Sequence, residues 1–413
     1  MTPAPLSRNR NYRLLWGSQL LSVAGFSGSM IAFPLLVLDI THSAAASGLV
    51  LTASAVAGLV AGIPAGALAD RWNRRKLMLG CEAGYALAML SVVAACWWNF
   101  LGVPHIVAVA VVIGLCGALF DPAEEATLPR VVPAEQLASA VAMNGARGHL
   151  GQLSGTALGG ILYTASRWLP FAADALAHTV SLVGLLFLRV PAQAKAGTPL
   201  RGLHHEILDG LRWVWGQRLL RAIGLCAVGL NFFFAAFYLV VIVLAQQRGV
   251  PSGEIGVMAA MFGGGGILGA LAAPRLHRAL SPYLAITGVF WMLAVLTPLA
   301  VFIDRGYVMG VLLAAMAFLA PTANTTIGTF QLLLTPGELR GRLTGVMGVA
   351  TGVAAAAGPA LGGGLMEVLT GSQAVLVCAA GMAVVTILTT FSATVRSFSR
   401  EVAAEALSSE RSS

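Results

Sequence analysis

Charged residues are scarce in this chain. They make up 10% of its 413 residues, against about 25% in an average soluble domain, whereas hydrophobic residues make up 57%. A chain of this composition cannot bury its apolar surface in one aqueous core, so its solvent must be lipid. The scarcity excludes an ordinary soluble protein and predicts a membrane protein.

Cysteine is scarce as well, and short motifs for metal, phosphate or nucleophilic chemistry are missing from the sequence. The five cysteines fall inside apolar runs without a Cys-x-x-Cys spacing, so we expect them to be packing residues. His204, His205 and Glu206 are adjacent, and neighbouring histidines of a helix point apart, so no metal site is expected there. Without a Walker motif, a nucleophile elbow or a zinc signature, we expect no enzyme and no cofactor.

The basic residues exceed the acidic ones, with a formal net charge of +8, but they stand singly between apolar runs. They form no basic face that follows a phosphate backbone, so no nucleic-acid partner is expected. Most lie in or beside alternate connections: Arg71, Arg74, Arg75, Lys76, Arg130, Arg189, Lys195, Arg201, Arg212, Arg218, Arg275, Arg278, Arg340 and Arg342. Because cytoplasmic loops are enriched in lysine and arginine, both termini are predicted to be cytoplasmic.

Twelve apolar runs are bounded by turn residues. Each is long enough to cross a bilayer core of about 30 Å as a helix of roughly 20 residues. Their approximate bounds are 14–38, 47–69, 77–98, 104–125, 137–163, 168–188, 219–245, 254–273, 282–303, 307–331, 342–367 and 372–395. The sequence therefore predicts an all-α membrane protein with twelve transmembrane helices.

The chain repeats itself at one offset of 203 residues. GALA at 66–69 recurs at 269–272, Pro133 and Glu135 recur as Pro336 and Glu338, and the run 157–160 recurs at 360–363. Independent coincidences would not share one offset. We expect two pseudo-symmetric six-helix halves: 1–188, a cytoplasmic linker at 189–217, a second half at 218–395, and a cytoplasmic tail at 396–413.

The linker has two interpretations. Its stretch 204–218, HHEILDGLRWVWGQR, has apolar residues near helical spacing with charges between them. This pattern suits an amphipathic helix on the inner membrane face. The alternative is a simple connection whose length lets the two halves rock.

The span 66–76, GALADRWNRRK, sets one acid, three arginines and a lysine in a short turn between two apolar runs. The glycine lets helix backbones approach, the acid sits at the membrane edge, and the cations hold the turn in the cytoplasm. The span resembles the loop between helices two and three of the major facilitator superfamily, whose pattern is Gly-x-Leu-x-Asp-Arg-x-x-Arg-Arg/Lys. The resemblance implies a transporter of two six-helix halves, with its substrate site at the midplane between them.

From this resemblance we expect a gating latch at the inner end of the first half. Its members are Gly66, Asp70, Arg71, Arg74, Arg75 and, near the cytoplasmic end of helix four, Asp121. In the second copy Asp70 corresponds to Ala273 and Arg71 to Pro274. Because the charges are retained mainly in the first half, a gating role is favoured over a purely structural one.

Other segments resemble exporters of the superfamily. GQLSGTALGG at 151–160 is similar to the helix-five signature of proton-coupled drug antiporters, with Thr156 in place of its proline. Around 9–22, 120–137 and 169–181 the chain resembles the macrolide-efflux and enterobactin-exporter branch. An arginine in helix four that some antiporters use for proton coupling is missing, so their coupling site is not carried over.

Glycines recur at four-residue steps on four of the expected helices. They are Gly58, Gly62, Gly151, Gly155, Gly159, Gly265, Gly269, Gly358 and Gly362. In the superfamily, helix two meets eleven and helix five meets eight, so these thin faces suit sliding contacts between halves. Ordinary tight helix packing is the alternative, and the two are compatible.

Charged groups inside lipid are costly and need partners. Asp121 either locks the inner gate by pairing with Arg74 or Arg75, or it transfers protons. Asp174 either titrates during transport or bridges helices, and Arg147 on the adjacent helix is its candidate partner. Of these candidates for proton coupling (Asp174, Asp121 and Arg147), Asp174 is expected to titrate, because a nearby arginine would hold Asp121 ionised. Glu82, Asp39 and Glu367 are expected to contact interfacial water.

Polar and aromatic side chains on three expected helices are candidates for a substrate cavity. They are Ser18, Gln19 and Ser22 in helix one, Asn231 and Phe234 in helix seven, and Thr325 and Thr329 in helix ten. A mildly polar wall with aromatic rings suits a bulky, mostly apolar substrate. Aromatics that face lipid or pack between helices are the alternative.

These features predict a secondary active transporter that exports a hydrophobic or amphipathic small molecule, such as an antibiotic, secondary metabolite or siderophore, by proton-coupled alternating access. One alternative is an importer of a nutrient or siderophore on the same fold, and another is a non-transporting membrane receptor. The expected partners are the substrate, protons and the lipid bilayer. We expect a monomer in the cell membrane.

Overall fold

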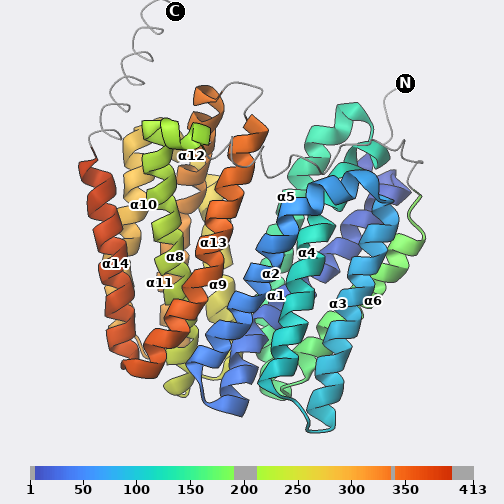
Figure 1. The fold of residues 1–413 in the computed structure, drawn as a ribbon, viewed down its shortest axis with the longest axis horizontal. Coiled ribbons are helices and arrows are strands. Elements are labelled where there is room, and N and C mark those ends of the chain that lie inside the picture. Colours follow the sequence, from blue (N-terminus) through green and yellow to red (C-terminus); the bar gives the residue numbers. More distant parts are fainter. Residues whose placement is uncertain (1–4, 190–211, 336–339, 393–413) are drawn as a thin grey trace, which may run out of the picture. The chain divides into compact units, whose positions relative to one another are not determined.

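The computed structural model describes residues 5–189, 212–335 and 340–392, which are mostly helical with no strand among them. The helices before residue 189 are α1 (Arg10–Thr41), α2 (Ala44–Arg71), α3 (Arg74–Trp97), α4 (Val103–Val131), α5 (Leu137–Ala165) and α6 (Leu169–Leu186) (Figure 1). Those that follow are α8 (Arg218–Gln247), α9 (Ser252–Ala279), α10 (Pro282–Leu296), α11 (Gly306–Phe318), α12 (Ala320–Leu334), α13 (Arg340–Val368) and α14 (Gly371–Phe391). Short 3-10 helices are η1 (Leu6–Arg8), η2 (Ala134–Gln136) and η3 (Thr297–Phe302).

Each expected span coincides with a helix or with two consecutive helical segments, so the all-α membrane fold is confirmed. The span 282–303 is α10 followed by η3, and the span 307–331 is α11 followed by α12. Among the described residues, 11 helical segments are long and apolar enough to cross a membrane. The remaining expected span is α5, which is less apolar because it carries residues such as Arg147, His149 and Gln152.

Local sequence signals explain where several helices begin. The side chains of Asn9, Ser43 and Asn73 each accept a hydrogen bond of 3.1 Å from a backbone N–H in the first turn of α1, α2 and α3. Thr370 and Gln373 form a reciprocal capping box at the start of α14. These side chains satisfy backbone donors that have no partner within the helix.

Two compact units divide the chain. The first holds Met1–Leu200 and Ala245–Ala260, and the second holds Arg201–Leu244 and Met261–Ser413. In the first unit α1 packs against α5 and α6, α2 packs along α4, and α3 packs against α4 and α6 (Figure 1). In the second unit α10 packs against α12 and α14, and α13 contacts α12 and α14.

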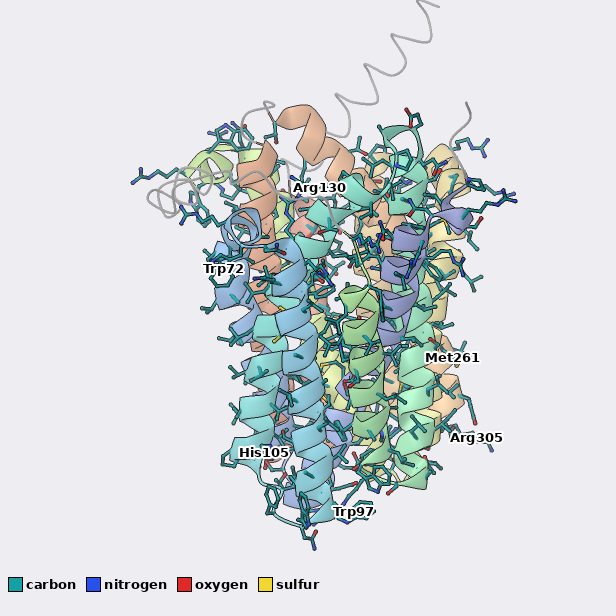
Figure 2. All side chains as sticks on the ribbon, turned by 90° about the vertical axis from the view of Figure 1, so that its right-hand side faces the viewer. Trp72, Trp97, His105, Arg130, Met261 and Arg305 are labelled. Atoms are coloured by element: carbon teal, nitrogen blue, oxygen red, sulfur yellow. The ribbon has the colours of Figure 1, made fainter. Side chains whose placement is uncertain are left out.

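The two ends of the first unit differ in their side chains. Trp72 and Arg130 lie at one end, and Trp97 and His105 lie at the opposite end (Figure 2). The helix α3 begins two residues after Trp72 and ends at Trp97, so it runs the full length of the unit. The arginine-rich turn with Trp72 and the exposed Trp97 therefore mark opposite ends, as expected for two membrane surfaces.

The predicted amphipathic helix lies mostly outside the described residues. Only its last part is described, and there residues 212–216 are helical. The predicted tail at 396–413 lies entirely outside them.

Candidate functional site

A cavity of about 470 Å³ is formed within the first unit by side chains of α1, α3, α4, α5 and α6. Aromatic rings and polar or titratable groups share its wall: Phe26, Tyr85, Phe120, Gln19, Ser22, Glu82, Asp121, His149, Gln152 and His178. Rings supply apolar contact area, while a few placed polar groups orient a ligand. This composition is typical of a small-molecule site.

Glu82 on α3 is the centre of a buried hydrogen-bond network. Glu82 is only 1% exposed. Its Oε1 accepts hydrogen bonds from Nε2 of Gln19 (2.9 Å) and from Oγ of Ser181 (2.8 Å). Its Oε2 lies 2.6 Å from Nδ1 of His178, and the hydroxyl of Ser22 is 3.5 Å away. The expectation that Glu82 contacts interfacial water is therefore wrong.

Asp174 on α6 is completely buried and lies at the other side of the same histidine. Its Oδ2 accepts a 2.6 Å hydrogen bond from Ser29 of α1. Its Oδ1 lies 3.2 Å from Nε2 of His178, within ion-pair distance but without the alignment of a hydrogen bond. His178 thus stands between two buried carboxylates, one facing each ring nitrogen.

An aromatic stack connects this network to the cavity. The rings of His178 and Tyr85 lie parallel, with centroids 4.2 Å apart and planes within 2°. The ring of Tyr85 meets that of Phe26 edge-on at 6.2 Å, and both belong to the cavity wall. A movement of the imidazole would therefore change the shape of the wall.

Arg147 on α5 binds Glu124 on α4 rather than the predicted Asp174. Two hydrogen bonds of 2.6 and 3.1 Å join the guanidinium to the carboxylate, and the two side chains are 8% and 10% exposed. The pair lines a second hollow of about 630 Å³, together with Asp121 and Glu125. Asp121 is exposed and belongs to the walls of both hollows.

The arginines of the predicted latch bind the ends of neighbouring helices. Nη1 of Arg74 donates to the carbonyl of Ala126 on α4 (2.8 Å), and Nε of Arg75 donates to that of Leu185 on α6 (3.0 Å). Cations near carbonyls at helix C-termini are favourable. Gly66 and Asp70 lie outside the residues whose side chains the structure describes, so the latch stays a prediction.

The other predicted cavity residues are described here within their own units. Ser18 is buried and donates to the carbonyl of Leu14 (2.7 Å). In the second unit, Asn231, Thr325 and Thr329 donate to carbonyls four residues earlier, and the two threonines line a hollow of about 250 Å³. Phe234 stacks on Phe262 at 5.4 Å. Gln19 and Ser22 alone of this set line the wall next to Glu82.

The predicted glycines pack helices together within each unit. A Cβ atom on Gly155 or Gly159 would overlap with the backbone of α1 at Ala24 or Gly28, and one on Gly358 or Gly362 with that of α8 at Phe232 or Ala236. The contacted residues also correspond between the halves, because Ala24 and Phe232, like Gly28 and Ala236, are 208 residues apart. Gly265 and Gly269 meet α11, Gly58 meets Gly114 of α4, and Gly151 meets Val23; Gly62 faces open space. The described contacts match tight packing repeated in both halves.

The segment 245–260 joins the first unit at the end of the helices opposite the arginine-rich turn. Nε2 of Gln246 donates to Oδ1 of Asp39 (2.6 Å), whose Oδ2 accepts from the hydroxyl of Tyr163. The backbone N–H of Gly253 donates to Oγ1 of Thr164 (2.8 Å). Asp39 is thus held by protein donors at this end.

Sequence reasoning missed His178, and it missed the pairing of Glu124. One signal was available: Asp174, His178 and Ser181 are spaced four and three residues apart, so they share one face of a helix. On α3 the same holds for Glu82 and Tyr85, three residues apart. The two faces meet in the structure.

Long apolar helices around a cavity with buried titratable groups define a multi-pass membrane protein of the transporter type. The family model described as Major Facilitator Superfamily matches residues 15–331, and the chain belongs to that superfamily. The resemblance in its 66–76 turn is thereby confirmed.

Similar proteins of known name include exporters. The multidrug efflux pump Tap of Mycolicibacterium fortuitum is 29% identical over 374 residues, which cover 84% of this chain and 86% of the relative. Tap of Mycobacterium tuberculosis is 27% identical over 368 residues, 84% of each. The enterobactin exporter EntS of Escherichia coli is 25% identical over 373 residues, 87% of this chain and 86% of the relative.

Solved structures share the fold. The nucleoside transporter NupG has a TM-score of 0.73 at 11% identity, covering 92% of this chain and 98% of that one. A bacterial homolog to the human lysosomal transporter Spinster, inward-facing and unoccupied, has a TM-score of 0.73 at 15% identity, covering 95% and 98%. At such identities the likeness shows the fold alone.

Proposed function

We propose that this protein exports a hydrophobic or amphipathic small molecule in exchange for protons. One observation carries the proposal: a single cavity in the first unit borders both aromatic rings and the buried network of Glu82, His178 and Asp174. The rings Phe26 and Tyr85 suit the apolar part of a substrate. The network supplies groups that bind and release protons, which an antiporter needs.

The outward direction is supported by the relatives. Proteins that are 25% to 29% identical over more than four fifths of this chain are named efflux pump and exporter. No lysine or arginine is among the residues of the cavity wall in the described part of the chain, so the wall offers no fixed positive charge to an organic anion.

The proposed cycle is a rocking of two six-helix halves, 1–188 and 218–395, between inward-open and outward-open states. The arginine-rich turn after α2 is proposed to face the cytoplasm, with both termini on that side of the cell membrane. Gly66, Asp70, Arg71, Arg74, Arg75 and Asp121 are proposed to form the latch of the inner gate. A monomer is sufficient for this cycle.

The test is transport by purified protein in proteoliposomes, with a panel of amphipathic antibiotics and dyes. We expect an imposed pH gradient, acidic on the side that receives substrate, to accelerate export of at least one compound. Retention of the same panel in cells with and without the gene provides the in vivo control. Unchanged retention of every compound together with energy-dependent uptake of one would establish an importer, and binding without transport would establish a receptor.

A further inference from the structure

We propose that His178 carries the exchangeable proton on its Nε2 and transmits its charge state to the substrate cavity through Tyr85. The inference rests on the proton coupling proposed above and names the group and the route. Three helices supply the parts: His178 and Asp174 on α6, Glu82 and Tyr85 on α3, and Ser29 on α1.

The proton count follows from the geometry of the imidazole. A neutral histidine has one N–H donor and one bare nitrogen, whereas ionised carboxylates are acceptors only. Here both ring nitrogens face a carboxylate oxygen, Nδ1 that of Glu82 at 2.6 Å and Nε2 that of Asp174 at 3.2 Å. With a neutral ring and two ionised carboxylates, one ring nitrogen would face a carboxylate without a proton between them. Both contacts are favourable only if His178, Glu82 and Asp174 together hold one more proton.

The two carboxylates differ in how well they are satisfied. Glu82 has four donors around it, from Gln19, Ser22, Ser181 and His178. Asp174 has one aligned donor, Ser29, and its Oδ1 has no aligned partner. The Nδ1 side is therefore the anchored side of the ring, and the Nε2 side is where a proton is gained and lost.

Loss of the Nε2 proton places a lone pair against Oδ1 of Asp174. The repulsion in a buried, low-dielectric site favours a turned or shifted ring. The ring lies flat on Tyr85 at 4.2 Å, and the hydroxyl of Tyr85 packs over Gly117 of α4, where an added Cβ would lie 2.8 Å away. A displaced His178 ring therefore moves Tyr85 and changes the cavity wall that Tyr85 and Phe26 form. In the proposed coupling, the wall shape reached after proton release is the one that binds substrate, so the two events favour the same conformation.

No arginine or lysine is among the described residues that border the cavity. Asp121 on α4 and His149 on α5 are the other titratable groups that border the cavity with the network. The thiol of Cys81 on α3 belongs to the apolar cluster of the first unit, and Cys116 on α4 packs against that cluster. The helix α1 contributes the uncharged Gln19, Ser22 and Ser29. With no lysine or arginine in the described cavity wall, His178 is the group in contact with both carboxylates that can carry a positive charge.

The first experiment measures protons directly. Purified protein in a weakly buffered detergent solution with a pH indicator receives ethidium as the probe. We expect the wild type to release about one proton per ethidium bound, since one Nε2 proton is exchanged. His178→Gln is expected to bind ethidium without release. His42→Asn, at the exposed left-handed C-cap of α1 and outside the cavity wall, is expected to behave as the wild type. Full release by folded His178→Gln overturns the inference.

A second measurement does not depend on the variant. Solid-state NMR of ¹⁵N-histidine-labelled wild type in lipid should show, among the seven histidines, one buried ring with both nitrogens protonated at neutral pH. A His178 ring with a bare Nε2 throughout the physiological range would refute the assignment. If His178 has a bare Nε2 and export is still driven by a pH gradient, the proposed function stands and only the assignment of the proton to His178 is wrong. If ethidium is transported without any response to a pH gradient, the proton coupling itself is refuted.

Discussion

Arg147 on α5 and Glu124 on α4 form a two-pronged ion pair, with hydrogen bonds of 2.6 and 3.1 Å, beside a hollow in the first unit. Each partner satisfies a charge that would otherwise be buried alone. Removal of one partner leaves the other uncompensated, which costs far more than the net contribution of the pair.

We expect Glu124→Gln to lower the free energy of unfolding by about 3 kcal/mol, because it leaves the guanidinium of Arg147 unpaired. Glu125→Gln is the matched control, since Glu125 is exposed and its neighbour in sequence. Thermal unfolding in detergent checks both variants. The double variant Glu124→Gln with Arg147→Met should recover part of the loss, and equal stability of the two single glutamine variants would contradict the importance of the pair.

Gly25→Ala is expected to impair transport by about tenfold, which corresponds to about 1.4 kcal/mol. A Cβ atom at Gly25 would lie 2.5 Å from Oδ1 of Asp174 and 3.0 Å from its Cα, so α1 must move away from the network. Gly17→Ala on the same helix meets no atom within 4 Å and should transport normally. The measurement is gradient-driven export in proteoliposomes, and equal rates for both variants would show that the contact has no functional effect.

Gly362→Ala is expected to destabilise the protein by about 2 kcal/mol, because overpacking forces helices apart. The added Cβ would lie 2.5 Å from the carbonyl oxygen of Ala236 on α8. Gly364→Ala, two residues later, meets open space and should be neutral or more stable by up to about 1 kcal/mol, the helix propensity of alanine over glycine. Melting temperatures in detergent distinguish the two, and their coincidence would rule out close packing of α13 on α8.

Asp70→Asn should cripple transport while expression and membrane insertion stay near normal. The reason is the proposed latch, in which the acid stabilises one gate state and not the fold. Measuring the amount of folded protein by size-exclusion chromatography, in parallel with the transport rate, separates an effect on the gate from an effect on the fold. Wild-type turnover in the variant, or loss of folded protein, would show that its role is different.

Asp174→Asn should abolish the response of export to an imposed pH gradient. The amide oxygen still accepts a hydrogen bond from Nε2 of His178, but it lacks the negative charge that favours a protonated imidazole. Asp121→Asn removes an exposed carboxylate of the same cavity and of the proposed latch, so we expect it to slow export but to keep the response to the pH gradient. Proteoliposome assays at a fixed substrate concentration compare the two. A fully responsive Asp174→Asn protein would transfer the coupling role to Asp121 or to Glu82.

Much of the fold could be predicted because its signals are local. The apolar runs coincide with helices, and cap residues such as Asn73 and Thr370 stand where α3 and α14 begin. The repeat at 203 residues predicted related packing, and Gly159 and Gly362 do contact α1 and α8 in the same manner. Periodicity and composition carry this information along the chain itself.

The candidate site was only partly predictable. Asp174 was singled out as a buried acid, and its burial is complete. Its partner was taken to be Arg147 because the two lie on consecutive helices, whereas the structure pairs Asp174 with His178 on its own helix. Depth along a helix is readable from sequence to within a few residues, and an error of one residue turns a side chain by about 100°.

The sequence by itself determined that lipid is the solvent, that the chain is a row of membrane-spanning helices, and that its two halves are related. These follow from the length and apolarity of each run, which act residue by residue. The tertiary structure alone decided that Glu124 meets Arg147 and that His178 stands between Glu82 and Asp174. Such pairings depend on the rotation and depth of whole helices, which are set by how closely their glycine-bearing faces pack.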